Sequence, residues 1–257
     1  MNIGQVLRVA LVGWVAALVP VCGWAEGCEG CHGDQALYVK NRKLYDYYQD
    51  WLTSPHKEAG VTCSQCHGGN PDASDRAAAH QGLPRVSDPS STVFYKNQAQ
   101  TCGRCHPAVA EQFTRSRHHA AVSGKETAPT CSTCHRAMNK KPYYRDIVRS
   151  ACQHCHNEAS GVLRPEVVDR ADEVLHRVNI SRGYLGWTIK HYEREGWPGE
   201  SGRVVDGLRK TYHDVLAKTH SFELLAADDE SAALLAELKE VFKTETGSSR
   251  EGPPRAR

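Results

Sequence analysis

The stretch "TCGRCHPAVAEQFTRSRHH", residues 101–119, holds the two features that decide how this chain is interpreted. It opens on a Cys-x-x-Cys-His motif and closes on two further histidines, His118 and His119. Cys-x-x-Cys-His attaches a c-type haem, in which two thioether bonds hold the porphyrin and the histidine ligates the iron. The opposite face of that iron takes a second ligand or stays open. Histidines outside the motif are therefore candidate distal ligands.

The motif occurs five times along the chain. Zinc knuckles and disulfides share the Cys-x-x-Cys spacing, but neither requires a histidine after every second cysteine. The sequence therefore predicts five covalently attached haem c groups, with each cysteine pair forming thioethers and each motif histidine acting as the proximal iron ligand. The motifs are Cys28/Cys31/His32, Cys63/Cys66/His67, Cys102/Cys105/His106, Cys131/Cys134/His135 and Cys152/Cys155/His156.

The N-terminal segment has the pattern of a signal peptide. An apolar run covers residues 9–22, and the small residues Gly23 and Ala25 follow it at a spacing that suits signal peptidase. Cleavage after Ala25 would also remove Cys22, the one cysteine outside the haem motifs. The run is shorter than the roughly 20 apolar residues of a membrane helix. We therefore predict a signal peptide at 1–25 and a periplasmic protein; the alternative is an uncleaved inner-membrane anchor.

Composition gives information about the binding partners and about the hydrophobic core. The chain has 32 basic and 30 acidic residues, a net charge of +2, which gives no argument for binding nucleic acid or an anionic membrane surface. Turn-rich stretches such as "HGGNPDASD" leave few long periodic segments among the haem motifs. A side-chain core would be thin there, and the haems are expected to fill it.

After the last haem motif, apolar residues recur at helical spacing. We predict a mainly α protein with extensive irregular structure, in which the C-terminal helices cover haems, form a dimer face or dock a partner. The predicted divisions are a haem domain at 26–160, a helical region at 161–246 and a disordered tail at 247–257. Helices are expected at 164–178, at 182–196 after an N-cap at Ser181, at 203–220 and at 229–243.

Histidines are the expected distal ligands, because Met138 is the only methionine besides the initiator. Without axial methionine, low reduction potentials are expected. His56 and His118 both follow a Ser-x-His pattern, and His213 and His220 lie seven residues apart on one helix face. The candidate distal ligands are His56, His80, His118, His213 and His220.

Two stretches carry a resemblance to a known family. They are W51-x-x-S-x-H56 leading into "GVTCSQCHGG", and "CGRCHPAVAEQFTRSRH", which ends at His118. In these the chain resembles the periplasmic multihaem cytochromes c that include NapC/NirT-type quinol dehydrogenases, pentahaem nitrite reductases and hydroxylamine oxidoreductase-type cytochromes. The resemblance implies redox partners such as a quinol dehydrogenase or a terminal reductase. All five motifs here end in His, whereas pentahaem nitrite reductases typically bind the catalytic haem through Cys-x-x-Cys-Lys.

The expected function is electron transfer between redox partners through low-spin, mostly bis-histidine haems, with no catalytic residue. The alternative is a reductase of a small nitrogen or sulfur substrate, such as nitrite, hydroxylamine or a tetrathionate-like anion, at one open haem. Membrane association is expected only if the N-terminal segment is retained. The sequence leaves self-association open.

Overall fold

A computed structural model describes residues 27–124, 128–136, 145–160, 165–196 and 201–247. The predicted signal peptide, Met138 and all but the first residue of the predicted tail lie outside these ranges. Every regular element in them is helical, which confirms the mainly α prediction. No helix in these ranges is both long enough and apolar enough to cross a membrane.

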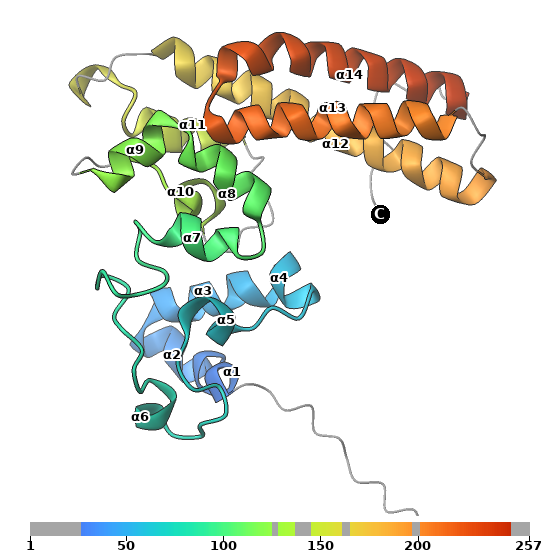
Figure 1. The fold of residues 1–257 in the computed structure, drawn as a ribbon. Helices are drawn as coiled ribbons and strands as arrows, with labels where there is room; N and C mark the ends of the chain where they lie inside the picture. The colour runs from blue at the N-terminus through green and yellow to red at the C-terminus, as the bar shows by residue number, and fades with distance from the viewer. Residues whose placement is uncertain (1–26, 125–127, 137–144, 161–164, 197–200, 248–257) are drawn as a thin grey trace, which may run out of the picture.

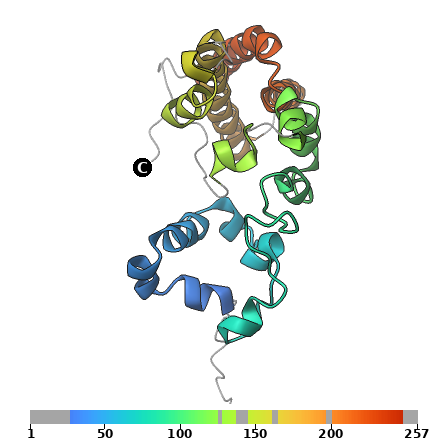
Figure 2. The same ribbon diagram turned by 90° about the vertical axis from the view of Figure 1, so that its left-hand side faces the viewer.

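The haem motifs lie on short helices joined by irregular segments, as the sequence predicts. Figures 1 and 2 show α1–α6 at the end of the molecule away from the C-terminal helices, with α7–α11 between. The elements are α1 (Gly27–His32), α2 (Gln35–Lys40), α3 (Arg42–Leu52), α4 (Pro55–Glu58), α5 (Cys63–His67), α6 (Arg76–Ala79), α7 (Gln98–Gly103), α8 (Pro107–Thr114), α9 (Arg117–Ser123), α10 (Cys131–His135), α11 (Arg145–Gln153) and the 3-10 helix at Glu158–Ser160.

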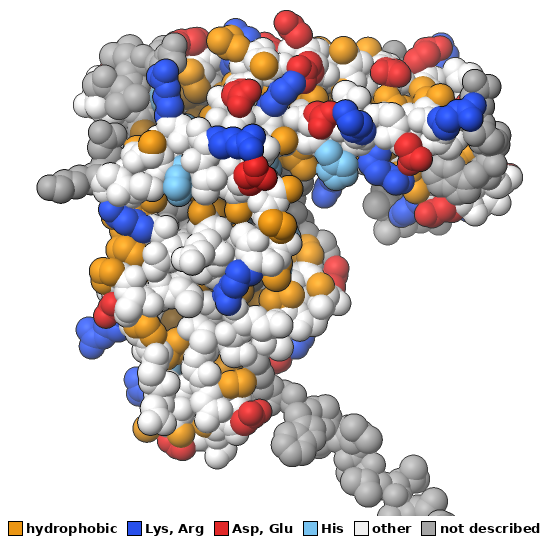
Figure 3. All heavy atoms as spheres, viewed as in Figure 1, with side chains coloured by type: hydrophobic (Ala, Val, Ile, Leu, Met, Phe, Trp, Pro, Cys, Tyr) orange, Lys and Arg blue, Asp and Glu red, His pale blue; other side chains and the backbone are white. Residues whose placement is uncertain are grey.

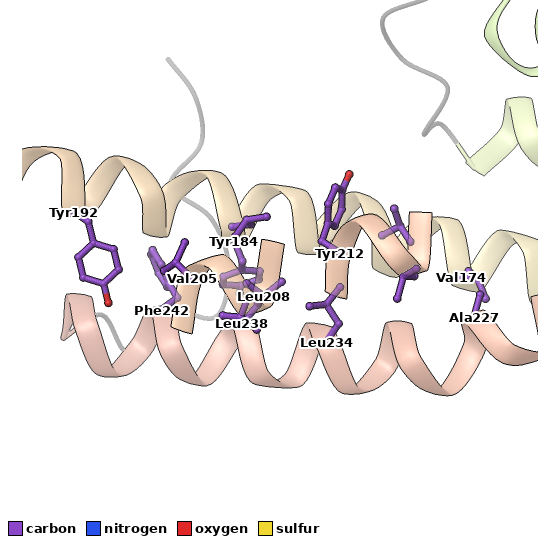
Figure 4. Packing of buried hydrophobic residues seen from close by; sticks show 13 residues of the cluster. Val174, Tyr184, Tyr192, Val205, Leu208, Tyr212, Ala227, Leu234, Leu238 and Phe242 are labelled. Carbon is purple, nitrogen blue, oxygen red and sulfur yellow. The ribbon is translucent and has the colours of Figure 1, made fainter. Parts of the chain in front are cut away.

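Three long helices form a bundle beside the haem motifs: α12 (Pro165–Glu195), α13 (Ser201–Ser221) and α14 (Leu224–Thr246). Their facing sides bury one continuous apolar core, which includes Val174, Leu208, Leu234 and Leu238 (Figure 4). Such burial stabilises by about 25 cal/mol per Å² of apolar surface removed from water.

One expected helix boundary is wrong. The sequence predicts that Ser181 caps a new helix, but α12 runs through it without a break, and the Ser181 side chain is fully buried. Valines of the same helix, Val174 and Val178, are buried in the bundle core, so packing outweighs the local capping preference of Ser181. The predicted stop at Gly196 is confirmed, since α12 ends at Glu195 and Gly196 has a φ of +93°.

The haem half, by which we mean the described residues up to Ser160, has few buried apolar side chains. Of its described residues, the buried apolar ones are Trp51, Ala99, Phe113 and Val122. Other large apolar side chains there stay exposed, among them Val39 and Val86, and Figure 3 shows apolar atoms at the surface of this half. This distribution agrees with a fold in which haem plates supply the apolar interior.

The bundle packs directly on the haem half. Helix α13 contacts α8, and α11 contacts α12. The Arg149 side chain on α11 reaches two carboxylates of α12, Asp169 at 2.9 Å and the buried Asp172 at 3.3 Å. The C-terminal helices are thus placed to reach the nearest haem motifs.

Candidate haem-ligating site

Four motif histidines each face a second histidine. His32 faces His80 with ring centroids 6.3 Å apart, and His106 faces His56 at 6.1 Å. In the other two pairs, His156 faces His118 at 6.2 Å and His135 faces His220 at 6.4 Å.

These separations are those of two imidazoles on opposite sides of one metal ion. A metal–imidazole bond is about 2.0 Å, and the ring centroid lies about 1.1 Å beyond the nitrogen, so opposed ligands have centroids about 6.2 Å apart. All four observed separations lie within about 0.2 Å of that value. Aromatic rings in direct contact also have centroids about 4.5–7 Å apart, but each of the four pairs joins one haem-motif histidine to one histidine outside the motifs. The four pairs therefore fit iron ligands.

The Ser-x-His pattern is a small capping unit that occurs twice. Ser54 caps α4 by accepting a hydrogen bond from the amide of Lys57 at 3.3 Å, and Ser116 caps α9 by accepting one from the amide of His119 at 3.1 Å. In each unit, the serine amide also donates to the carbonyl of a buried aromatic residue three positions earlier, at 2.9 Å. The cap fixes the first helical turn and therefore the direction of the histidine in it.

Each capping unit leads into a haem helix that begins with a second cap. Thr62 precedes α5 and Thr130 precedes α10, and both form a capping box with the residue at the third helical position. Helices as short as α5 and α10 are unstable in isolation, so such caps are needed to hold the motif cysteines in place. Residues 51–67 form one structural unit, and the described residues 113–124 and 128–135 repeat its two caps.

His80 and His220 are oriented in a different way. The Nδ1–H of His80 donates to the carbonyl of Arg76 at 2.7 Å, and that of His220 donates to the carbonyl of Leu216 at 2.8 Å. A proton held on Nδ1 leaves the lone pair of Nε2 free for a metal, which is a common way of orienting a ligating histidine. Both hydrogen bonds span one helical turn, so the end of the helix fixes the ring.

Three of the paired rings carry a buried nitrogen without a hydrogen bond among the described residues. These atoms are the Nδ1 atoms of His56, His118 and His156. Buried polar atoms in folded proteins are normally paired, so an unpaired set calls for an explanation. A haem iron and propionates beside these rings would supply polar partners, and the site residues thus fit haem c.

The candidate distal ligand His213 is not brought to a haem motif. It is exposed, and its ring lies 5.6 Å from that of Tyr212 on the same helix. His213 and His220 do share a face of α13, but they are two turns apart, about 10 Å along the axis. Only the end of α13 that carries His220 reaches His135.

One motif histidine has no facing histidine. All fourteen histidines of the chain lie in the described ranges, and none of their rings faces His67. Burial lowers the pKa of His67, and the charge of His32 lowers it further, so the first and second motifs are neighbours.

Electrostatic neighbours place the remaining motifs in sequence order. Burial raises the pKa of the Cys66 thiol, and Cys102 of the third motif raises it further. A hydrogen bond with Cys131 of the fourth motif raises the pKa of Cys102. Burial raises the pKa of Cys152, in the fifth motif, to about 11, with Cys134 contributing next. The predicted haem attachment would replace these thiols with thioethers and leave their proximity unchanged.

Three motif cysteines are exposed in the described part of the chain, although the sequence predicts that each is bonded to haem. They are Cys31, Cys102 and Cys105. None of the three forms a disulfide. The protein side chains alone therefore do not bury the three sulfur atoms. A bound porphyrin would have to bury them. Thioether attachment at all ten motif cysteines stays a prediction.

The backbone suits haem attachment in the third and fifth motifs. The amide of Cys105 donates to the carbonyl of Cys102 at 3.2 Å, and the amide of Cys155 donates to that of Cys152 at the same distance. Residues three apart in a helical turn lie on one face. Both cysteines of a pair can therefore meet the same edge of one porphyrin.

Comparison with known proteins points to the same class. Two matches are the C-type polyheme cytochrome OmcB of Geobacter sulfurreducens, from strains DL-1 / KN400 and ATCC 51573 / DSM 12127 / PCA. Each is 28% identical over 206 residues, which cover 70% of this chain and 24% of OmcB. The chain therefore spans about a quarter of the length of these relatives. It matches no protein-family model and no solved structure.

Proposed function

We propose that this chain is a pentahaem c-type cytochrome that carries electrons along a row of five haems. The observation that carries the proposal is the set of four histidine pairs at the separation of opposed iron ligands, each pair containing one motif histidine. The distant relationship to a polyheme cytochrome supports the same class of function.

The protein groups have simple roles in this proposal. Bound haem c supplies one-electron redox chemistry. The cysteines fix each porphyrin, and the motif histidine holds one face of each iron. Where a second histidine faces the first, it excludes other ligands from the iron and keeps the coordination the same in both oxidation states. Such a site favours electron transfer over substrate binding.

The order of the motifs supports transfer along one route. Neighbour relations run from the first motif to the second, third, fourth and fifth, with no motif set apart. Hydrogen bonds tie adjacent motifs together: Arg104, inside the third motif, donates to the carbonyl of Gln65, inside the second, at 2.8 Å. An electron could therefore enter at either end of the row and leave at the other.

We also propose export to the periplasm after removal of residues 1–25, and membership of the periplasmic multihaem superfamily named above. The repeated capping unit of Ser54 and Ser116 supports the family proposal, since it contains the residues of the resemblance. The proposed partners are a quinol dehydrogenase or a terminal reductase.

Intact-mass measurement of the mature protein tests the haem number and the N-terminus together. Five added haem masses and an N-terminus at Glu26 are expected. A smaller number of haems, or zinc in place of haem, would refute the proposal. Redox titration followed by optical spectroscopy should then give several overlapping one-electron steps at low potential.

A second candidate function is reduction of a small nitrogen or sulfur compound at one haem. The specific observation in its favour is that His67 lacks a facing histidine. Turnover of nitrite or hydroxylamine by the reduced protein would support this function, and binding without turnover would favour the carrier.

A further inference from the structure

We propose that the haem on the second motif, Cys63/Cys66/His67, has an open distal face that binds a small exogenous ligand at iron. The inference rests on the proposed pentahaem function and identifies which of the five irons is accessible.

The N-terminal part of the described chain has no unassigned histidine that could ligate the iron on His67. Residues 27–100 contain four histidines, of which His32 and His67 belong to motifs. The other two are committed, because His80 faces His32 and His56 faces His106. No histidine from this part of the chain is left for the iron on His67.

Histidines from the rest of the chain are placed elsewhere. His119 packs on Phe113 with centroids 5.5 Å apart, and His191 lies 5.8 Å from the Tyr192 ring. His154, His176 and His213 are exposed. His191, His176 and His213 all belong to the C-terminal bundle, which Figure 1 shows at the opposite end from α5.

The internal repeat explains why the second motif is the exception. In each unit, the capped histidine faces a motif beyond the unit: His56 faces His106, and His118 faces His156. The unit's own motif histidine, His67 or His135, must therefore find a distal partner outside the unit. His135 finds His220 on α13, whereas the first unit has no bundle beside it.

The surroundings indicate the class of ligand. Arg104 lies beside the second motif, where its guanidinium donates a hydrogen bond to the Gln65 carbonyl at 2.8 Å. A guanidinium beside a ferric haem favours anions. The site therefore suits a small single-atom donor: an anion such as nitrite on the oxidised iron, and a neutral diatomic such as carbon monoxide on the reduced iron.

Carbon monoxide titration of the reduced holoprotein tests the proposal, with haem content measured first. Five haems and one carbon monoxide per chain are expected. Fewer than five haems would instead contradict the proposed function. Five haems with no carbon monoxide bound would overturn the open site alone and leave the carrier intact, whatever group fills the iron.

Two variants locate the ligand. C63A/C66A removes the second haem and should abolish carbon monoxide binding, whereas C28A/C31A removes the first and should retain it. Binding that persists in C63A/C66A overturns the assignment. If these variants do not fold, His56→Ala retains all five haems and opens the third; carbon monoxide binding should then rise from one to two per chain. A rise from zero to one would equally overturn the proposal.

Discussion

Replacing His220 with alanine should convert one haem per chain from low-spin to high-spin. His220 faces His135 with ring centroids 6.4 Å apart and planes only 5° from parallel, and alanine offers no ligand. The structure gives four facing pairs, so the number of bis-histidine haems should fall from four to three.

The conversion should be complete, because no other histidine is free to replace His220. The charges of His106 and His56 also act on His135, but these two rings face each other. His213→Ala is the matched control, since it makes the same substitution on the same face of α13, about 10 Å along the helix. It should leave the spin states unchanged, because His213 is exposed and lies beside Tyr212.

Quantitative electron paramagnetic resonance of the oxidised proteins measures both variants, with haem content normalised per chain. An increase of one high-spin iron in His220→Ala, and none in His213→Ala, is the expected result. The ligand assignment is refuted if His220→Ala keeps all its low-spin irons, or if both variants lose the same number.

Four further predictions address the caps, the ring planes, the acid response and the backbone. Ser54→Ala and Ser116→Ala should each lower the free energy of unfolding by about 1 kcal/mol, measured by denaturant titration, and a loss near zero would contradict the capping role. Two pairs have planes at 75° and 86° and two at 33° and 5°, so electron paramagnetic resonance should show two low-spin classes of equal size, the first more anisotropic; a single class would contradict the geometry. Burial, followed by the charge of His220, lowers the pKa of His135 to about 4, so the ring is neutral above that pH and is protonated only as the pH falls through it. Because iron binding competes with the proton, loss of the ligand should need a still lower pH. Optical spectra should therefore show ligation of this haem unchanged from neutral pH to about pH 5. Phe222 has a φ of +61°, so the free energy of unfolding of Phe222→Gly should exceed that of Phe222→Ala by about 1 kcal/mol in denaturant titration; the reverse order would contradict backbone strain there.

Several features of the site could be predicted from local sequence. The Ser-x-His pattern made His56 and His118 candidate ligands, and the N-cap serine of each pattern fixes the direction of the nearby histidine in the first helical turn. The structure places both rings opposite motif histidines. The thin core was also predictable, because turn-rich sequence between motifs leaves few apolar positions in register.

Other features depend on tertiary contacts that the sequence does not show. Helical periodicity put His213 and His220 on one face, but it could not tell which of the two turns meets the haem half. The pairing of His56 with the third motif rather than the second could not be read from chain distance either. Ser181 shows the same limit, since a capping residue remained inside a helix because the bundle buries it.

The turn after α13 contacts histidines of two candidate haem sites. His220 faces His135 of the fourth motif, and two residues later the Phe222 ring lies 4.0 Å from the ring of His118, which faces His156 of the fifth. Because both side chains belong to one short segment, a displacement of this segment would move both rings away from their partners at once. In the proposed row of haems, the fourth and fifth sites would therefore depend on the same contact with the bundle.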